Sequence, residues 1–218
     1  MKVLVACEYS GRVRDAFRAK GHDAWSCDLL PCEDDSRYHI HGDVRNELQP
    51  NRWDMLIAHP DCTYLTNSAA WALKDGPYHQ NVKPGTLVGA ARRQAQAEAL
   101  DFVRLLFDAP IEKKCLENPI GKIGTAIRKH TQIIQPWQFG HDANKATCLW
   151  LENLPLLVPT KIIGGRVVEW PRGSGKFVER WSNQTDSGQN NLTPSDDRWK
   201  DRARTYQGWA DAMADQWG

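Results

Sequence analysis

Three short apolar runs, each followed at once by polar or acidic residues, constrain the fold of this chain more than any other feature. These runs are Lys2–Cys7, Asp23–Leu29 and Trp53–Ala58. After the first run, Ser10-Gly11 forms a turn, and Arg12–Lys20 carries apolar residues at helical spacing until Gly21 ends the helix. The order strand, glycine turn, helix, strand, loop, strand is typical of the first half of a doubly wound α/β domain.

The rest of the chain predicts further elements of the same domain and a small appendage. Residues 91–108 form the strongest helical pattern, with one apolar face made of Ala95, Ala99, Phe102, Val103 and Leu106. We expect a loop over residues 69–90, strands at Lys114–Leu116 and Thr147–Leu151, a hairpin with a mobile loop within Gly164–Asn191, and a closing helix over Trp199–Gln216. The predicted division is a main domain at 1–154, a small loop-rich region at 155–191, and a C-terminal segment at 192–218 that returns to the main domain.

The composition argues against a membrane span, a signal peptide and a metal site. No apolar run approaches the roughly 20 residues of a membrane span, and the N-terminal run is too short for a signal peptide. We therefore expect a cytoplasmic protein with no membrane partner. The six cysteines are scattered, and the one group with metal-like residues, Cys27, Cys32, His39 and His41, has irregular spacing, so no metal site is predicted. The sequence predicts no particular oligomeric state.

Four polar segments follow the apolar runs, where the carboxyl ends of the strands are expected. These segments are Glu8-Tyr9-Ser10-Gly11, Asp28, His59-Pro60-Asp61-Cys62 and Glu117-Asn118-Pro119. Ligands of open α/β sheets bind outside the carboxyl ends of the strands. If the strands lie side by side, these segments converge on one cleft.

The first two segments have the features of a nucleoside site. A glycine turn that opens a helix lets the backbone and the helix N-terminus approach a ligand, and an acid after the second strand can bind ribose hydroxyls. The turn lacks the GxGxxG pattern, however, and Gly173-Ser174-Gly175-Lys176 lacks the spacing of a phosphate-binding loop. An ordinary tight turn explains Gly11 equally well.

The other two segments combine a thiol with a carboxylic acid. A thiolate at Cys62 can attack an electron-poor carbon, while Glu117 protonates the heteroatom that receives the charge. A buried thiol beside a turn is the simpler explanation for an isolated cysteine. Burying Glu117 and Asn118 at a strand end is costly unless both find partners, and this favours a site.

At these motifs the sequence resembles the cytosine-5 DNA methyltransferases, most closely their short, phage-type members, across nearly the full chain. Pro60-Asp61-Cys62 is similar to the Pro-Pro-Cys nucleophile motif of that family, and Glu117-Asn118-Pro119 to its Glu-Asn-Val motif. The resemblance implies the Rossmann-like fold of an S-adenosylmethionine-dependent methyltransferase, with the catalytic domain at 1–154 and a small recognition region at 155–191. It also implies that Cys62 attacks C6 of a cytosine flipped out of DNA, that Glu117 protonates N3, and that Asn118 orients Glu117 or contacts the base.

The resemblance extends to the cofactor and substrate sites. The residues that it places at the cofactor are Tyr9, Ser10, Gly11, Asp28, Asp43 and Pro60, and those that it places at the DNA are Pro119, Lys145, Thr147, Arg172 and Lys176. Segments Leu192–Pro194 and Arg202–Gly208 resemble the family's Leu-Thr-Pro-Arg-Glu and Leu-Gln-Gly elements. Further candidates for phosphate contacts are Lys122, Arg128, Lys129, Arg166 and Arg180. Candidates to fill the space that the flipped base leaves in the duplex are Tyr64 and Trp71. Candidates for stacking on bases are Trp170, Trp181 and Trp199.

The sequence also departs from the family. Asp61 replaces the second proline, Thr63 replaces a glutamine, the later glycines of the cofactor turn are missing, and a Gln-x-Arg-x-Arg element gives way to Lys145-Ala146-Thr147. A carboxylate at Asp61 would oppose thiolate formation if it pointed toward Cys62.

Three alternatives to DNA cytosine-5 methylation stay open. One is methylation of an exocyclic amine, which uses an Asn/Asp-Pro-Pro-Tyr/Phe motif without a thiol. Another is the same carbon chemistry on RNA or on a free cytidine nucleotide. The third is nucleic-acid binding without catalysis.

Overall fold

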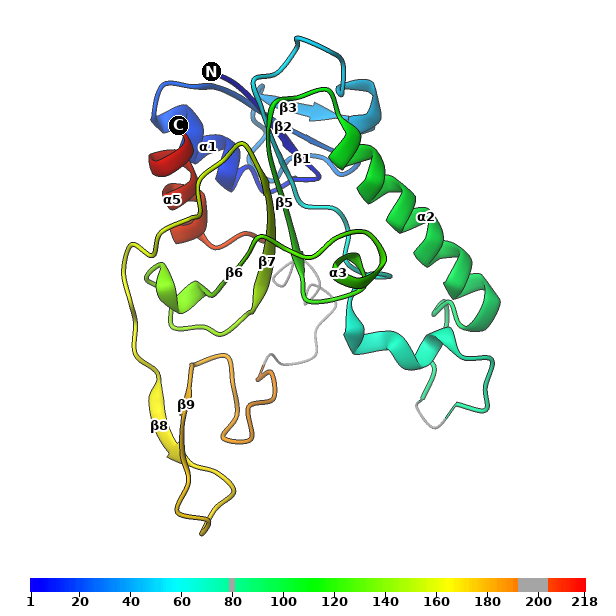
Figure 1. Cartoon of the computed structure of the whole chain (residues 1–218), viewed down its shortest axis with the longest axis vertical. Helices are drawn as coiled ribbons and strands as arrows, with labels where there is room; N and C mark the ends of the chain where they lie inside the picture. The colour runs from blue at the N-terminus through cyan, green and yellow to red at the C-terminus, as the bar shows by residue number, and fades with distance from the viewer. Residues whose placement is uncertain (79–80, 192–203) are drawn as a thin grey trace.

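A seven-stranded mixed sheet forms the centre of the computed structural model, which describes residues 1–78, 81–191 and 204–218 (Figure 1). The strands are β1 (Lys2–Ala6), β2 (Asp23–Asp28), β3 (His39–His41), β4 (Met55–Ala58), β5 (Lys113–Pro119), β6 (Gln132–Ile134) and β7 (Thr147–Glu152). Their order across the sheet is β3-β2-β1-β4-β5-β7-β6, with β7 antiparallel to both of its neighbours. The predicted α/β class is confirmed, and the sheet is consistent with a Rossmann-like methyltransferase fold.

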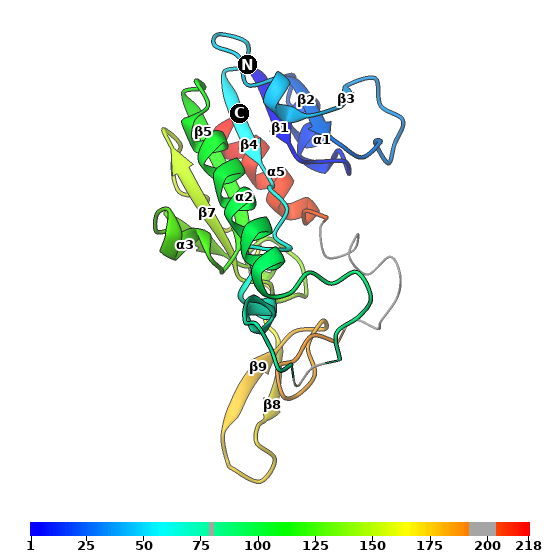
Figure 2. The same ribbon diagram turned by 90° about the vertical axis from the view of Figure 1, so that its right-hand side faces the viewer.

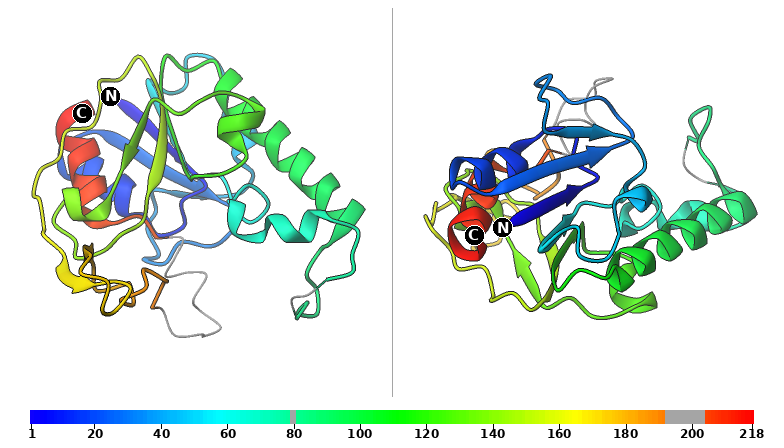
Figure 3. Two further views of the ribbon diagram at one scale, coloured as in Figure 1. Left: turned by 60° about the horizontal axis from the view of Figure 1, so that its bottom comes forward. Right: turned by 90° about the horizontal axis from the view of Figure 1, so that it is seen from above.

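Helices cover both faces of the sheet. On one face lie α1 (Arg12–Ala19) and α5 (Gln207–Trp217), and on the other lie α2 (Gly89–Asp108) and the short α3 (Ile123–Ala126) (Figures 1 and 3). Alternate residues of a strand point to opposite faces. In β1, Val3 and Val5 therefore join the core under α1 and α5, whereas Leu4 and Ala6 join the core under α2. Both faces of β1 are apolar because both are covered.

The C-terminal helix closes the fold against the N-terminal one. Trp209, Met213 and Trp217 of α5 are buried in the core that also contains Val13 and Phe17 of α1. The helix begins at Gln207, and the part of the predicted helix over residues 199–203 lies outside the described residues. Segment Leu192–Pro194 and residues 202–203 of the second family-like element also lie outside them.

Two predicted elements in the middle of the chain have different bounds in the structure. The strand predicted at Lys114–Leu116 runs on through Glu117 and Asn118 to Pro119, because β7 pairs with it in antiparallel register as far as Thr147. The segment predicted as loop contains a 3-10 helix, η2 (Asn67–Leu73). Strands β3 and β6 were not predicted, since each is three residues long and depends on a neighbouring strand for its hydrogen bonds.

A two-stranded hairpin extends beyond the carboxyl ends of the central strands (Figures 1 and 2). It consists of β8 (Arg166–Glu169) and β9 (Phe177–Arg180), within the segment where a hairpin was predicted. The division of the chain at residues 154 and 191 stays a prediction. In the described ranges, no helix is both long enough and apolar enough to cross a bilayer.

Candidate active site

A cavity of about 770 Å³ opens at the carboxyl ends of β1, β2 and β4. The order of the strands reverses at the junction of β1 and β4, and this switch point is where open α/β sheets bind ligands. The residues that line the cavity include Glu8, Tyr9, Ser10, Asp28, Asp43, His59, Pro60, Asp61, Thr63, Tyr64, Ala95, Glu98, Ala99 and Phe102. The cavity is large enough for a nucleoside-sized ligand.

The N-terminus of α1 is capped by Glu8 rather than left open for a ligand. One carboxylate oxygen of Glu8 accepts the N–H of Val13 at 2.7 Å, and the other accepts the N–H of Arg14 at 3.2 Å. Burial raises the pKa of Glu8, and the positive charge of His59 and these two N–H donors oppose the rise. Of the two explanations of the glycine turn, an ordinary tight turn fits this capped helix better than a helix end open to a ligand. A phosphate, which favours a free helix N-terminus, would meet a carboxylate here.

The cavity wall is acidic. Asp28 is the last residue of β2 and accepts the N–H of Leu30 at 2.9 Å, and burial raises the pKa of its carboxyl. Asp43 caps a short 3-10 helix, η1 (Val44–Asn46), by accepting the N–H of Arg45 at 2.9 Å, and also forms an ion pair with the Arg45 side chain. Such a wall suits a ligand with hydroxyl or amino donors and a positive charge better than a polyphosphate.

The segment around Cys62 is fixed through its backbone carbonyls. From β5, Asn118 donates to the carbonyl of Pro60 at 2.7 Å. From α2, Arg92 and Gln96 donate to the carbonyls of Thr63 and Tyr64 at 2.9 and 2.8 Å. The segment is thus held from two elements, and the half-buried Cys62 lies between the anchored positions.

Backbone contacts from the loop after β5 hold the same segment. The backbone N–H of Lys122 donates to the carbonyl of Leu65 at 2.7 Å, and Thr66 and Gly121 form an isolated bridge. A Cβ atom on Gly121 would lie 2.1 Å from the Leu65 oxygen, so only glycine allows this close approach.

Asp61 shapes the turn that the family builds with a second proline. One of its carboxylate oxygens accepts the N–H of Thr63 at 2.9 Å and the hydroxyl of Thr63 at 2.7 Å. Aspartates that bind the backbone two residues ahead form a local turn without proline. One carboxylate oxygen of Asp61 is therefore held by Thr63.

Replacing Asn118 with alanine is expected to lower the free energy of unfolding by about 1–3 kcal/mol, because the buried Pro60 carbonyl loses its donor. Urea unfolding followed by circular dichroism measures the difference. The matched control is Gln49→Ala, which removes an exposed amide with a 3.3 Å hydrogen bond and should stay within about 0.5 kcal/mol. Equal stability of the two variants would show that Asn118 does not hold this segment.

Glu117 pairs with a histidine that the sequence analysis did not select. Nδ1 of His59 lies 3.0 Å from Oε2 of Glu117, and their side chains are 9% and 12% exposed. Burial alone would raise the pKa of Glu117, but the hydrogen bond from His59 and the charge of Lys145 lower it below its ordinary value. Burial would likewise lower the pKa of His59, but Glu117 and Glu8 raise it.

The structure places the other predicted site residues in different surroundings. Gly11 has a φ of 71° and faces the Arg14 guanidinium, and it is not among the described residues that line the cavity. Thr147 is fully buried, pairs with Pro119 across β5 and β7, and donates its hydroxyl to the Lys145 carbonyl at 3.1 Å. As placed, Thr147 has no side-chain surface for DNA, so its predicted contact does not fit this structure.

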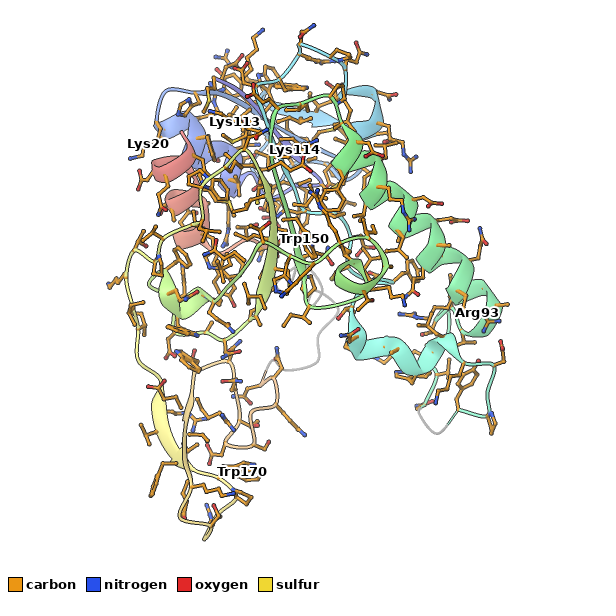
Figure 4. All side chains as sticks on the ribbon, in the orientation of Figure 1. Lys20, Arg93, Lys113, Lys114, Trp150 and Trp170 are labelled. Carbon is orange, nitrogen blue, oxygen red and sulfur yellow. The ribbon has the colours of Figure 1, made fainter. Side chains whose placement is uncertain are left out.

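Arg172 and Lys176 are exposed, whereas the aromatic candidates differ in burial. Arg172 and Lys176 are exposed in the loop between β8 and β9, where Trp170 also lies, whereas Trp150 is in the sheet core (Figure 4). Trp181 is buried and stacks on Trp137 at 5.5 Å. Trp71 packs against Tyr78, Tyr64 lines the cavity, and Trp199 lies outside the described residues.

Sequence reasoning missed His59, Arg92 and Gln96. His59 stands directly after β4, the position at which its neighbours Pro60 and Cys62 had been selected, and this was the available signal. Arg92 and Gln96 lie beside Ala95 on α2, whose face was treated only as apolar. In fact Ala95 and Ala99 line the cavity, and Val103 and Leu106 fill the core.

Comparisons with known proteins show no family for this chain. No protein-family model matches the sequence, and no curated protein matches it. Among the solved structures that match is a mutant of DNMT2 from Spodoptera frugiperda, with a TM-score of 0.37 and 17% sequence identity. The match covers 74% of this chain and 54% of that chain, so the chain spans about half the length of this neighbour. A likeness of this size carries no functional argument.

Proposed function

We propose that this chain transfers a methyl group from S-adenosylmethionine to C5 of cytosine in DNA, through a covalent adduct with Cys62. The observation that carries the proposal is the joining of the Cys62 segment to the end of β5. Asn118 holds the Pro60 carbonyl at 2.7 Å, and Glu117 holds His59 at 3.0 Å. A thiol and a carboxyl group from two strands are thereby brought to one edge of the sheet, next to an acidic cavity.

The roles of the chain's own residues follow from the chemistry of cytosine. C5 is too weak a nucleophile to accept a methyl group until a nucleophile has added to C6. The Cys62 thiolate forms the bond to C6, and a proton at Glu117 moves to N3, which receives the electron pair. After methylation, water takes up the C5 proton, the S–C6 bond breaks and N3 gives its proton back to Glu117, which restores the aromatic ring and the thiolate.

The residues of the cavity fit S-adenosylmethionine. Asp28 and Asp43 offer carboxylate oxygens to hydroxyl and amino donors, and the acidic wall suits a sulfonium cation. Glu8 at the helix N-terminus disfavours a ligand with phosphates. The cofactor supplies the electrophilic methyl group when bound, and Tyr9, Ser10 and Pro60 complete the proposed binding surface.

Replacing Asp28 with alanine is expected to weaken binding of S-adenosylmethionine by about tenfold, the effect of losing a hydrogen bond to a charged group. Isothermal titration calorimetry measures the dissociation constant. Asp101→Ala on the outer side of α2 is the control, because that side chain is 73% exposed and pairs with Arg104. An unchanged dissociation constant in Asp28→Ala would remove this residue from the cofactor site.

DNA is the proposed substrate because the hairpin of β8 and β9, which carries exposed basic side chains, extends beyond the carboxyl ends of the central strands, where the cavity opens. Arg172 and Lys176 on the hairpin can reach phosphates of a bound duplex. Pro119 and Lys145 belong to the proposed base-binding edge at the end of β5 and before β7.

The test is to incubate the protein with methyl-labelled S-adenosylmethionine and, separately, DNA, RNA and deoxycytidine monophosphate. Each product is digested to nucleosides and identified by mass spectrometry. Label in 5-methylcytosine from DNA is the predicted result. Label in RNA or in the free nucleotide alone would replace the substrate and keep the chemistry, whereas label on an exocyclic nitrogen alone would refute the proposal.

A further inference from the structure

His59 and Glu117 form a buried pair, and the proposed reaction gives the proton between them no role. An ionised carboxylate accepts hydrogen bonds and cannot donate them, so the ring nitrogen of His59 donates to Glu117 at 3.0 Å. Both side chains are about nine-tenths buried. A buried charged pair is retained when each partner compensates the other.

Three charged groups from separate elements surround His59. Glu117 comes from β5, Glu8 follows β1, and Lys145 precedes β7. The two carboxylates favour the protonated imidazole, and they outweigh burial and the Lys145 charge, so the pKa of His59 lies above its ordinary value. The second ring nitrogen, Nε2, is buried without a hydrogen-bond partner in the described chain, while Glu8 is already occupied by the N–H groups of Val13 and Arg14.

The pair creates a difficulty for Glu117 acting alone. The proposed reaction needs a proton at N3 of cytosine, but the pKa of Glu117 lies below its ordinary value, so at neutral pH its carboxyl group has already lost the proton. His59 can supply a proton, because its Nδ1 lies 3.0 Å from Oε2 of Glu117.

We propose, as an extension of the proposed function, that His59 is a positioning residue that stores the proton delivered by Glu117. When cytosine N3 approaches Glu117, the N–H bond at Nδ1 of His59 breaks and a proton moves to the carboxylate. The carboxyl group gives a proton to N3, and His59 becomes neutral. When the S–C6 bond breaks after methylation, N3 returns its proton to Glu117 and His59, so no proton is gained or lost by the pair over the cycle.

The first test needs no methylation. The imidazole of His59 is titrated by NMR in the intact, ligand-free chain, with histidine labelled with nitrogen-15. Its pKa is expected above the ordinary value, and in Glu117→Gln it is expected to fall below that value, because burial then dominates. His141, which contacts Tyr206 elsewhere in the fold and whose pKa is lowered by burial, should titrate identically in both proteins. A His59 pKa unaffected by Glu117→Gln would overturn the inference.

The second test is the pH dependence of kcat in His59→Asn. Asparagine keeps an N–H donor near Glu117 but holds no exchangeable charge, so the needed proton then depends on Glu117 alone. The alkaline limit of kcat is expected to move to lower pH, with the ratio of wild type to variant rising by about tenfold per pH unit, as for a single lost proton. KM should change little, and His130→Asn should retain the wild-type profile.

The outcomes separate this inference from the proposed function. Formation of 5-methylcytosine with superimposable pH profiles of His59→Asn and wild type would overturn the proton store and leave the methyl transfer standing. A coupled titration of His59 and Glu117 without methylation of any substrate would count against the proposed function instead. Should His59→Asn fail to fold, the NMR titration of the unaltered histidine still supports or overturns the inference.

Discussion

Replacing Cys62 with alanine is expected to reduce methyl transfer to cytosine by about 10⁴-fold or more, the scale seen when a covalent nucleophile is removed. Without the thiolate, nothing adds to C6 and C5 stays unreactive. Binding of S-adenosylmethionine should persist, because Cys62 is not among the described residues that line the cavity. Single-turnover methylation of DNA, with calorimetry of cofactor binding alongside, measures both effects.

Cys32→Ser is the matched control for the loss of a thiol. Cys32 is also half-buried, but it accepts a hydrogen bond from Arg14 at 3.1 Å, a contact that a serine hydroxyl retains. This variant should methylate at the wild-type rate. Activity retained in Cys62→Ala would contradict the covalent mechanism and favour methylation of an exocyclic amine, which uses no thiol.

Replacing Glu117 with glutamine is expected to reduce the single-turnover rate by about 10²–10⁴-fold, the usual contribution of a general acid. Glutamine has the same shape and still accepts the hydrogen bond from His59, but it cannot pass a proton to N3. The dissociation constant for S-adenosylmethionine should not change, because Glu117, like Cys62, is outside the described cavity lining.

Glu112→Gln provides the control for this charge change. Glu112 is exposed just before β5, and its backbone carbonyl accepts a hydrogen bond from Asn153 at 2.8 Å. Its rate should equal that of the wild type. An unaltered rate in Glu117→Gln would assign the protonation of N3 to another group.

The sequence predicted the parts of the fold that depend on local patterns. The apolar runs at β1, β2 and β4 and the helical periodicity of α1 and α2 are visible within windows of a few residues. The site was predictable to the extent that polar residues interrupt those patterns, as at Asp28, and at Pro60 and Asp61 after β4. A buried polar residue is costly, so its position after an apolar run is informative.

Features that depend on distant partners were not predictable. The extension of β5 through Glu117 and Asn118 requires β7, which pairs with it from some thirty residues away. The pairing of His59 with Glu117 joins positions 58 residues apart. The capping of α1 by Glu8 was hidden by the turn at Ser10-Gly11, which looked like a ligand-binding loop. None of these contacts leaves a periodic signal along the chain.

The central claim is the covalent bond between Cys62 and C6 of cytosine, and trapping that bond tests it most directly. The protein is incubated with S-adenosylmethionine and DNA containing 5-fluorocytosine, whose fluorine cannot leave as the C5 proton does, so the adduct cannot be released. We predict a stable protein–DNA complex whose digestion yields a modified peptide containing Cys62, and no complex with Cys62→Ala. Methylation of normal DNA without any trapped complex, or a complex at another residue, would contradict the account.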